Sequence, residues 1–447
     1  MVYDNPCFIN EKHWLFIMLY SRPMNVLRSL KYRPFAFLWT GQTISRLGDS
    51  LYYIALAWWV LEKTGSAVAM GTVLVFTQIP MLIFLLVGGV VVDRLPRLQV
   101  MFVADILSGI VVTFVSIFSW LGLLQIWHIY IASMIFGFVN AFFFPAYQAV
   151  IPQIVHPETL TSANSLNGLS QRLTGVVGPA LGAGLVAAGG TSMTFGLNAL
   201  SFFISAAFVF TLLRSGQDQD DEDASEPMGR QKLESNLSKK SMKEAIRQGF
   251  LDLREGLKFV VTVPWIWITI LVFGFVNITE AGPRAVALPF LIKQDLGADV
   301  ELLGLFGSVG SLGFVLGMVW LGQYVRLHRR GLLGYLSMVV SGGMLLPFAF
   351  VLPVPILVAS AFLDGISISV FSLVWTHTLQ EMVPAKLLGR VYSIDALGSF
   401  VLLPIGYSIS GWATDVFGAT KVFLAGGLGT ILLILLGLMH PVVRNLD

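Results

Sequence analysis

Twelve long apolar runs constrain this chain more than any other feature of its sequence. They lie at residues 34–61, 67–92, 98–120, 127–150, 163–188, 193–213, 265–292, 302–324, 332–352, 356–382, 388–416 and 421–439. A helix needs about 20 mainly apolar residues to cross a bilayer, and backbone polar groups inside lipid must be satisfied within helices or closed barrels. The runs therefore predict an all-α polytopic membrane protein with twelve transmembrane helices. Pro283 and Pro289 predict that the seventh of these helices is broken or kinked.

The composition agrees with a chain that is embedded in lipid. Of the 447 residues, 55% are hydrophobic and only 12% are charged, whereas soluble domains carry about 25% charged residues. One cysteine, Cys7, excludes an intrachain disulfide, and six scattered histidines predict neither a metal site nor a cofactor. No phosphate-binding loop and no catalytic motif is recognisable, so we expect neither an ATP-driven pump nor an enzyme. We expect no nucleic-acid partner.

The distribution of positive charge predicts the orientation of the chain. If both termini are cytoplasmic, the outward loops contain only Lys63, Lys293 and Lys421, whereas the inward loops, linker and tails contain twenty-two of the 28 Lys and Arg residues. Cytoplasmic loops of membrane proteins carry such an excess. We therefore expect a multi-pass protein of a bacterial inner membrane with both ends in the cytoplasm. The sequence leaves open whether Met1 or Met24 is the true start.

The polar segments divide the chain into two similar halves. We predict a cytoplasmic tail at 1–33, six-helix halves at 34–213 and 263–440, a linker at 214–262 and a second tail at 441–447. The linker is acidic and then basic, and its end has the periodicity of an interfacial amphipathic helix. A Gln-x-x-x-Pro-x-x-Leu pattern occurs at Gln153 and again at Gln380. Such repeats are typical of transporters with a substrate site between two halves.

Five charged residues fall within the predicted spans and are the candidate substrate or proton-coupling residues. Arg46 and Asp49 lie three positions apart in one span, Glu280 and Arg284 lie four positions apart in another, and Asp364 lies in a third. Charges inside a membrane are costly and usually functional. The alternative is that these are paired groups with a structural role. Desolvated carboxylates suit proton exchange near neutrality, and the arginines suit anionic substrates.

The loop after the second apolar run has a distinctive pattern, Gly-x-x-x-Asp-Arg-x-x-Arg, formed by Gly89, Asp93, Arg94 and Arg97. Taken alone, it is a charged turn that fixes topology. In this position it resembles the loop between helices 2 and 3 of the major facilitator superfamily. The resemblance implies that these four residues form a cytoplasmic latch. Pro96 stands where many members have glycine or aspartate.

Two further stretches resemble the branch of this superfamily that contains bacterial multidrug, macrolide and siderophore exporters. The first is the run from Phe142 through Pro145 to Asn164. The second is a Gly-Pro motif in the fifth span, formed by Gly175, Gly178, Pro179 and Gly182. The resemblance implies export. The physical alternative is a close-packing helix face, because the Gly178–Gly182 spacing lets a partner helix approach.

The resemblance also implies which residues line the cavity and what the chain does. The cavity-lining candidates, from helices 1, 4 and 10 of the family, are Tyr53, Tyr147, Trp375 and His377. We expect a monomeric secondary transporter that exports amphipathic small molecules in exchange for protons by alternating access. A siderophore or metabolite exporter of the same fold is the nearest alternative, and a non-transporting sensor or lipid-moving protein is another. The sequence does not identify the substrate.

Overall fold

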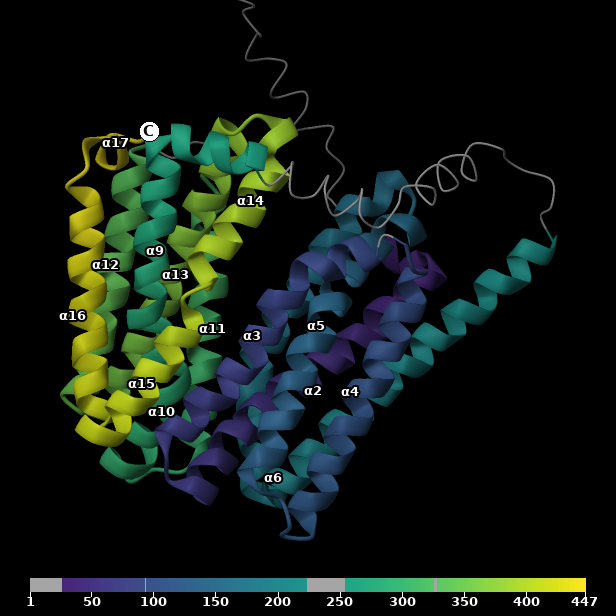
Figure 1. The fold of residues 1–447 in the computed structure, drawn as a ribbon, viewed down its shortest axis with the longest axis horizontal. Helices are drawn as coiled ribbons and strands as arrows, with labels where there is room; N and C mark the ends of the chain where they lie inside the picture. Colours follow the sequence, from purple (N-terminus) through teal and green to yellow (C-terminus); the bar gives the residue numbers. More distant parts are fainter. Residues whose placement is uncertain (1–25, 93, 223–253, 325–327) are drawn as a thin grey trace, which may run out of the picture.

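Long helices joined by short turns make up the protein in the computed structural model, which describes residues 26–92, 94–222, 254–324 and 328–447 (Figure 1). The first half contains η1 (Val26–Lys31), α2 (Arg33–Thr64), α3 (Ala67–Val92), α4 (Arg97–Trp120), α5 (Ile126–Ile154), η2 (Pro157–Thr159) and α6 (Leu160–Glu222). Residues 254–262, at the end of the predicted linker helix, are helical, and the rest of that prediction lies outside the described residues.

The second half is built from shorter pieces. It contains α9 (Pro264–Gly282), η3 (Pro283–Ala287), α10 (Leu288–Phe290), η4 (Leu291–Asp295), α11 (Val300–Leu321), α12 (Arg330–Ala349), α13 (Val354–Met382), α14 (Ala385–Phe400), α15 (Leu403–Phe417), α16 (Ala419–Leu438) and α17 (Pro441–Arg444). η3 and η4 are π-helical turns. η3 begins at Pro283 and η4 follows Pro289, the two prolines that predicted a broken or kinked helix. A proline removes a backbone hydrogen-bond donor and so interrupts the α-helix.

Two helices differ from the predicted boundaries. α6 includes both predicted spans 163–188 and 193–213, but Gly190 inside it has φ 76°, a backbone conformation that glycine adopts easily. The part of α6 before this turn runs parallel to α2 and contacts it near Gly178, and the part after the turn runs antiparallel and contacts it near Ser205. The element is therefore a hairpin of two helices. The predicted span 388–416 is divided between α14 and α15, because Pro404 lies in the first turn of α15.

The number of spans agrees with the prediction of twelve. Ten described segments are long and apolar enough to cross a membrane, and the segment Pro157–Arg214 is one of them. That segment crosses twice because of the turn at Gly190. α2 adds one span of 32 residues that also contains Arg46 and Asp49. The fold class predicted from the sequence is therefore confirmed.

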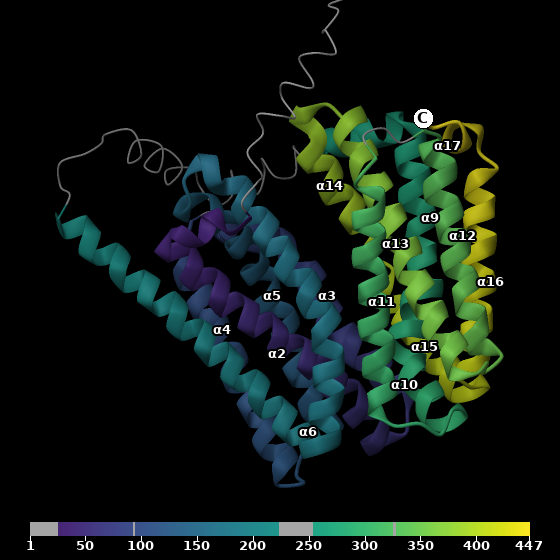
Figure 2. The ribbon, with the colours of Figure 1, turned by 180° about the vertical axis from the view of Figure 1, so that it is seen from behind.

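The two halves converge at one end and diverge at the other (Figures 1 and 2). The halves meet where α6 packs on α11 and where α3 packs on α15. The diverging end holds the C-terminus and the first turns of α14. The pair α3 and α15 meets at the start of α3, where Gly411 contacts the backbone of Ala67.

A carboxylate fastens the converging end. Asp415, near the end of α15, accepts hydrogen bonds from Ser66 Oγ at 2.6 Å, from the Ala67 backbone N at 2.6 Å and from the Val68 backbone N at 3.1 Å. These are donors that the start of a helix leaves without partners, and the helix dipole favours an anion there. Asp415 therefore caps α3 from the other half of the molecule.

Candidate substrate cavity and buried charge network

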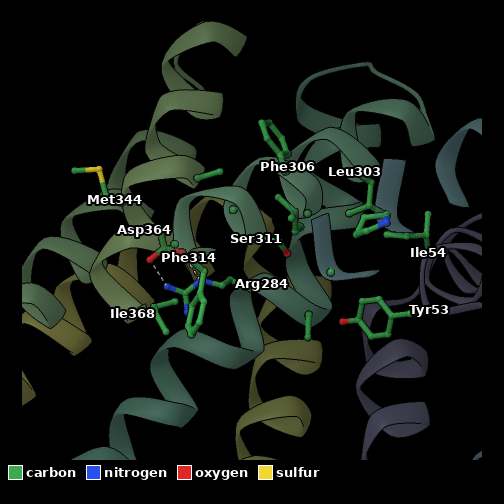
Figure 3. Close-up of a pocket in the computed structure, with 18 of the residues that line it drawn as sticks. Tyr53, Ile54, Arg284, Leu303, Phe306, Ser311, Phe314, Met344, Asp364 and Ile368 are labelled. Atoms are coloured by element: carbon green, nitrogen blue, oxygen red, sulfur yellow. Dashed lines mark hydrogen bonds and ion pairs between the residues drawn. The ribbon is translucent and has the colours of Figure 1, made fainter. Parts of the chain in front are cut away.

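A cavity of about 500 Å³ lies between the halves. Drug-sized ligands occupy pockets of roughly 300–1,000 Å³, so its size suits an organic small molecule. Figure 3 shows Tyr53 reaching it from the first half, while Arg284 and Asp364 lie on the wall formed by the second half. Its walls come from α2, α6, η3, α10, α11, α12, α13 and α16.

The cavity wall is mainly apolar with a few charged groups. Its apolar side chains include Ile54, Leu288, Leu303, Phe306, Phe314, Met344, Leu345, Phe348, Ile368 and Phe423. Its charged side chains are Arg172, Arg284 and Asp364. Apolar walls with a few placed polar groups are the usual construction of a small-molecule site. Such a wall suits an amphipathic ligand.

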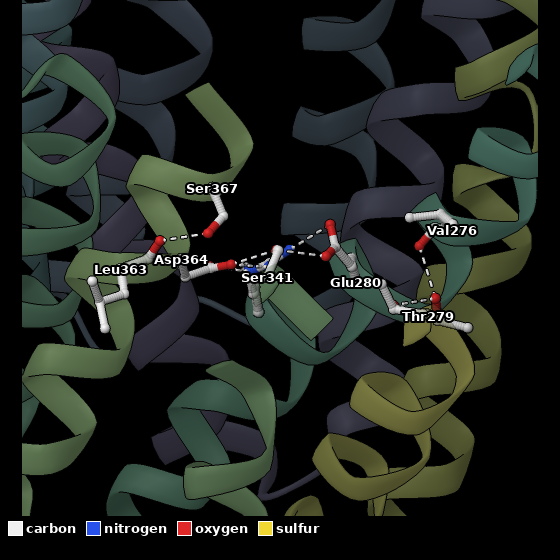
Figure 4. A network of polar contacts seen from close by, with 9 residues as sticks. Val276, Thr279, Glu280, Ser341, Leu363, Asp364 and Ser367 are labelled. Atoms are coloured by element: carbon white, nitrogen blue, oxygen red, sulfur yellow. Dashed lines mark hydrogen bonds and ion pairs between the residues drawn. The ribbon is translucent and has the colours of Figure 1, made fainter. Parts of the chain in front are cut away.

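Four side chains from three helical segments form a continuous polar network beside this cavity (Figure 4). Arg284 binds Asp364 through two nitrogens, with Nε–Oδ2 at 2.9 Å and Nη2–Oδ1 at 2.7 Å. Its third nitrogen, Nη1, lies 3.2 Å from Glu280 Oε2. Ser341 Oγ lies 2.7 Å from Glu280 Oε1 and 2.6 Å from Asp364 Oδ1. The fork geometry makes Arg284 a strong carboxylate binder.

The charges in this network do not balance. Two carboxylates share one guanidinium, so the ionised cluster has a net charge of −1, and one added proton makes it neutral. The side chains of Glu280 and Asp364 are only 7% and 14% exposed, and that of Arg284 is 27% exposed. A net charge that is shielded from water is costly. The cluster is therefore chemically suited to hold a single exchangeable proton.

The corresponding region of the first half is arranged differently. Arg46 Nη1 donates to Asn167 Oδ1 at 2.6 Å, and its guanidinium lies over the ring of Tyr147, 4.9 Å from its centre. The Tyr147 hydroxyl also donates to Asn167 Oδ1 at 2.6 Å. Asp49 is exposed and lies four residues before Tyr53, so the two share a helix face. Since Tyr53 lines the cavity, that face of α2 borders the space between the halves.

A buried carboxylate in the first half accepts hydrogen bonds only from neutral groups. Asp105 is 2% exposed, and its Oδ2 accepts from Ser205 Oγ at 2.7 Å and from Gln42 Nε2 at 3.4 Å. Gln42 Nε2 also donates to Ser205 Oγ at 2.8 Å. These contacts join α2, α4 and α6 into one bundle. Asp105 does not line the central cavity.

The predicted cavity residues do not all reach the central cavity. Tyr53 lines it, whereas Trp375 lines a smaller neighbouring cavity. Tyr147 is buried at 2% exposure beneath Arg46. His377 is exposed and lies 3.4 Å from Glu381. Both therefore differ from their predicted positions, because Tyr147 turns inward to Asn167 and His377 lies close to the end of α13.

The Gly-Pro motif of α6 packs against two helices on opposite sides. Gly178 contacts Ser50 of α2, and Gly182 contacts Leu51 of α2. Pro179 meets the glycine face of α11, where Cβ atoms at Gly304 and Gly307 would lie 2.6 Å and 2.9 Å from proline atoms. The motif therefore lies at the contact between the halves. Gly175 is on the cavity wall.

Only part of the predicted latch is described by the structure. Arg97 Nη1 donates to the Ala149 carbonyl oxygen at 3.1 Å, which fastens the start of α4 to α5. Arg94 is exposed. Asp93 lies outside the described residues, as do the surroundings of Gly89, so the latch stays a prediction.

Comparison with known proteins decides the family. The family model described as Major Facilitator Superfamily matches residues 38–407. The chain belongs to this superfamily. It is therefore a membrane-embedded transporter of small molecules and not an enzyme.

Curated relatives and solved structures agree with this assignment. The chain is 26% identical to macrolide efflux protein A of Streptococcus pyogenes, over 92% of this chain and 97% of the relative. It is 24% identical to the multidrug efflux pump Tap of Mycolicibacterium fortuitum, over 90% and 94%. The nucleoside transporter NupG shares the fold with a TM-score of 0.69, 12% identity and coverage of 91% and 98%. A bacterial homologue of the iron transporter ferroportin, in an inward-facing state, also shares the fold. Its TM-score is 0.65 and its sequence identity is 17%, over 91% of this chain and 98% of that chain.

Proposed function

We propose that the protein is a proton-coupled exporter that moves amphipathic small molecules by alternating access. One observation carries the proposal. A cluster of two carboxylates and one arginine, which takes up a single proton to become neutral, lies on the wall of a largely apolar, drug-sized cavity between the halves. The relatives named above are efflux proteins, which supports the direction of transport.

In this proposal the second half carries the proton, and both halves contact the substrate. A proton on Glu280 removes one negative charge next to Arg284, and Asp364 then keeps the guanidinium in a neutral pair. Loss of the proton restores the net charge of −1. When substrate enters beside Arg284 and Asp364, it changes the free energy of that negative charge. Substrate binding and proton binding are therefore coupled. Asp49 and Tyr53 offer a polar contact from the opposite wall.

The orientation follows from the two ends of the molecule. The diverging end, with the C-terminus, faces the cytoplasm, in agreement with the distribution of Lys and Arg. The converging end, with the Asp415 contact, faces outward. The described conformation then accepts substrate from the cytoplasm while the outer end is closed. Release of the Asp415 contact belongs to the opposite conformation.

The direct test uses everted membrane vesicles from cells that produce the protein, with labelled erythromycin as the first probe. Respiration acidifies the vesicle lumen, and export appears as accumulation inside. We expect accumulation that a protonophore abolishes, and we expect the Glu280→Gln variant to resemble vesicles without the protein. Accumulation that survives the protonophore contradicts proton coupling. Failure with macrolides, lipophilic cations and catechol siderophores alike contradicts export of amphipathic molecules.

One observation favours a second candidate, an exporter of acidic siderophores or metabolites. Arg172 lies on the cavity wall with its guanidinium 4.1 Å from the centre of the Phe314 ring, and among the described residues it forms no ion pair. Arg46 likewise forms no ion pair among the described residues, although Asp49 lies within its electrostatic range. A cation of this kind attracts an anion. If this candidate is correct, Arg172→Gln lowers export of a catechol siderophore far more than export of erythromycin.

A further inference from the structure

A second, smaller cavity, which we call the side chamber, adjoins the substrate cavity in the second half and reaches Glu280. Its volume is about 250 Å³, and α9, α12, α13 and α14 line it. Glu280 is on its wall, whereas Arg284 and Asp364 are on the wall of the central cavity. Ile368 borders both. The charge network therefore borders two adjoining chambers, and each chamber contacts a different carboxylate.

The size and the wall of this side chamber indicate water as its occupant. The volume lies below the roughly 300 Å³ at which pockets for drug-sized ligands begin. One water takes about 30 Å³ in the liquid, so several waters fit. Half of its fourteen lining residues are polar or charged and offer water hydrogen-bond partners, namely Thr269, Asn277, Glu280, Ser372, Thr376, Asp395 and Ser399. Asn277 lies three residues before Glu280, on the same face of α9.

Asp395 of α14 lies on the wall of the same chamber and is held in position. Its Oδ2 accepts from the Trp375 indole Nε1 at 3.0 Å, and its Oδ1 accepts from Ser399 Oγ at 3.4 Å. Asp395 and Glu280 are the carboxylates among the described lining residues, and no described lining residue is Lys, Arg or His. Nearby, Tyr392 donates to the Thr376 carbonyl oxygen at 3.3 Å, and Tyr335 bonds Thr269.

The depths of the two carboxylates differ. α9 and α14 both begin at the end that holds the C-terminus. Gly274 of α9 lies against the carbonyl oxygen of Gly398 in α14, so these two residues lie at the same depth. Glu280 comes six residues after Gly274 and Asp395 three residues before Gly398, which at 1.5 Å per residue places Asp395 roughly 13 Å closer to the cytoplasmic end. That separation is too long for direct proton transfer and requires intervening water.

We propose that the side chamber is a water-filled proton path and that Asp395 is its relay, an inference that rests on the proposed coupling role of Glu280. The Glu280 carboxyl releases its proton to chamber water, Asp395 takes a proton from that water, and Asp395 then releases it to the cytoplasm. Both residues end as carboxylates, so one proton moves and no other atom changes. Substrate and proton thus reach different carboxylates of the shared network.

The test follows protonation of Glu280 without any transported substrate. After a pH jump, time-resolved infrared spectroscopy on the purified protein records the carboxyl band that Glu280→Gln removes. We expect the intensity of this band to change about tenfold more slowly, or slower still, in Asp395→Asn, because a proton-transfer group is lost. The final amplitude of the change should stay the same. Asn keeps an oxygen that accepts from Trp375, and its amide group can donate to Ser399 Oγ, so a purely structural role predicts no change in rate. Asp395→Glu restores the rate, and Asp105→Asn behaves as wild type.

An unchanged rate in Asp395→Asn overturns the relay and leaves proton coupling at Glu280 intact. A wild-type protein whose Glu280 band does not titrate overturns the coupling role itself, and with it the relay. Access of water is tested separately with a Cys7→Ser background and a small charged methanethiosulfonate. We expect Ser372→Cys, on the chamber wall, to react, and Thr378→Cys, 1% exposed on the same helix, to stay unmodified. An unreactive Ser372→Cys contradicts a water-filled chamber.

Discussion

The two halves share a helical plan but place their intramembrane charges differently. In the second half, Glu280, Arg284 and Asp364 form one connected cluster with an unbalanced charge. In the first half, Arg46 binds neutral groups and Asp49 is exposed on the helix face that contains Tyr53. Equivalent places in a duplicated fold have therefore acquired different chemistry. We therefore propose that the exchangeable proton belongs to the second half, while Asp49 and Tyr53 add a substrate contact from the first.

The largest expected effect comes from removal of the shared cation. Arg284→Met leaves Glu280 and Asp364 without their partner, and breaking a buried ion pair from one side costs about 3–5 kcal/mol. We expect a large loss of thermal stability in detergent, much of which is regained when Glu280→Gln and Asp364→Asn are added. Arg46→Met is the matched variant of the first half and should cost only about 1 kcal/mol, the value of a hydrogen bond. Equal losses of thermal stability in Arg284→Met and Arg46→Met would contradict the proposed difference between the two halves.

The next effect concerns coupling. Glu280→Gln keeps the size and the hydrogen-bonding oxygen of the side chain but removes its proton exchange, so proton-driven export should fall about 100-fold or more. Exchange of labelled for unlabelled substrate across the membrane, which needs no net proton movement, should continue. The measurement compares both fluxes in the same proteoliposomes. Normal proton-driven export in this variant contradicts the assignment of the proton to the second half.

A smaller effect is expected for the matched residue of the first half. Asp49→Asn removes a charge that faces the space between the halves, and we expect about tenfold weaker export of a cationic substrate, the equivalent of roughly 1.4 kcal/mol. KM should rise while the number of protons moved per substrate stays unchanged. A variant that moves substrate without protons reverses the roles of the two halves.

The smallest effect concerns the contact that joins the halves. Asp415→Ala removes the acceptor at the start of α3, and loss of a helix cap costs about 1 kcal/mol, which shifts a two-state equilibrium roughly fivefold. We expect the outward-open population to increase, as measured by spin-label distances across the converging end. Asp415→Asn retains an acceptor and should shift the population less. An unchanged distance distribution in Asp415→Ala shows that the contact does not stabilise the closed end.

The sequence predicts the number of spans because length and apolarity are limited by the bilayer itself. The spacing of Glu280 and Arg284 predicts their contact, since residues four apart face each other on a helix. Ser341 carries no such signal: a serine in an apolar helix is ordinary, and only the packing of α12 against α9 and α13 brings it to the network. The three-residue spacing of Arg46 and Asp49 was less informative, because Asn167 of another helix offers Arg46 a closer partner.

Breaks within helices were predicted only in part. Pro283 and Pro289 indicated the interruption after α9, whereas the division between α14 and α15 was missed although Pro404 marks it. The two chambers could not be foreseen, because a cavity is what remains between side chains of several helices. Trp375 was predicted to line a cavity, yet only the structure distinguishes the side chamber from the central one.

The central claim is that substrate and proton exchange through a cluster in the second half. Its most direct test places the purified protein in liposomes with a pH-sensitive dye inside and adds erythromycin, lipophilic cations and catechol siderophores in turn. The account predicts substrate-triggered proton movement by the wild type, silence from Glu280→Gln, and reduced but coupled movement by Asp49→Asn. Substrate transport without proton movement, or equal proton movement by wild type and Glu280→Gln, contradicts it.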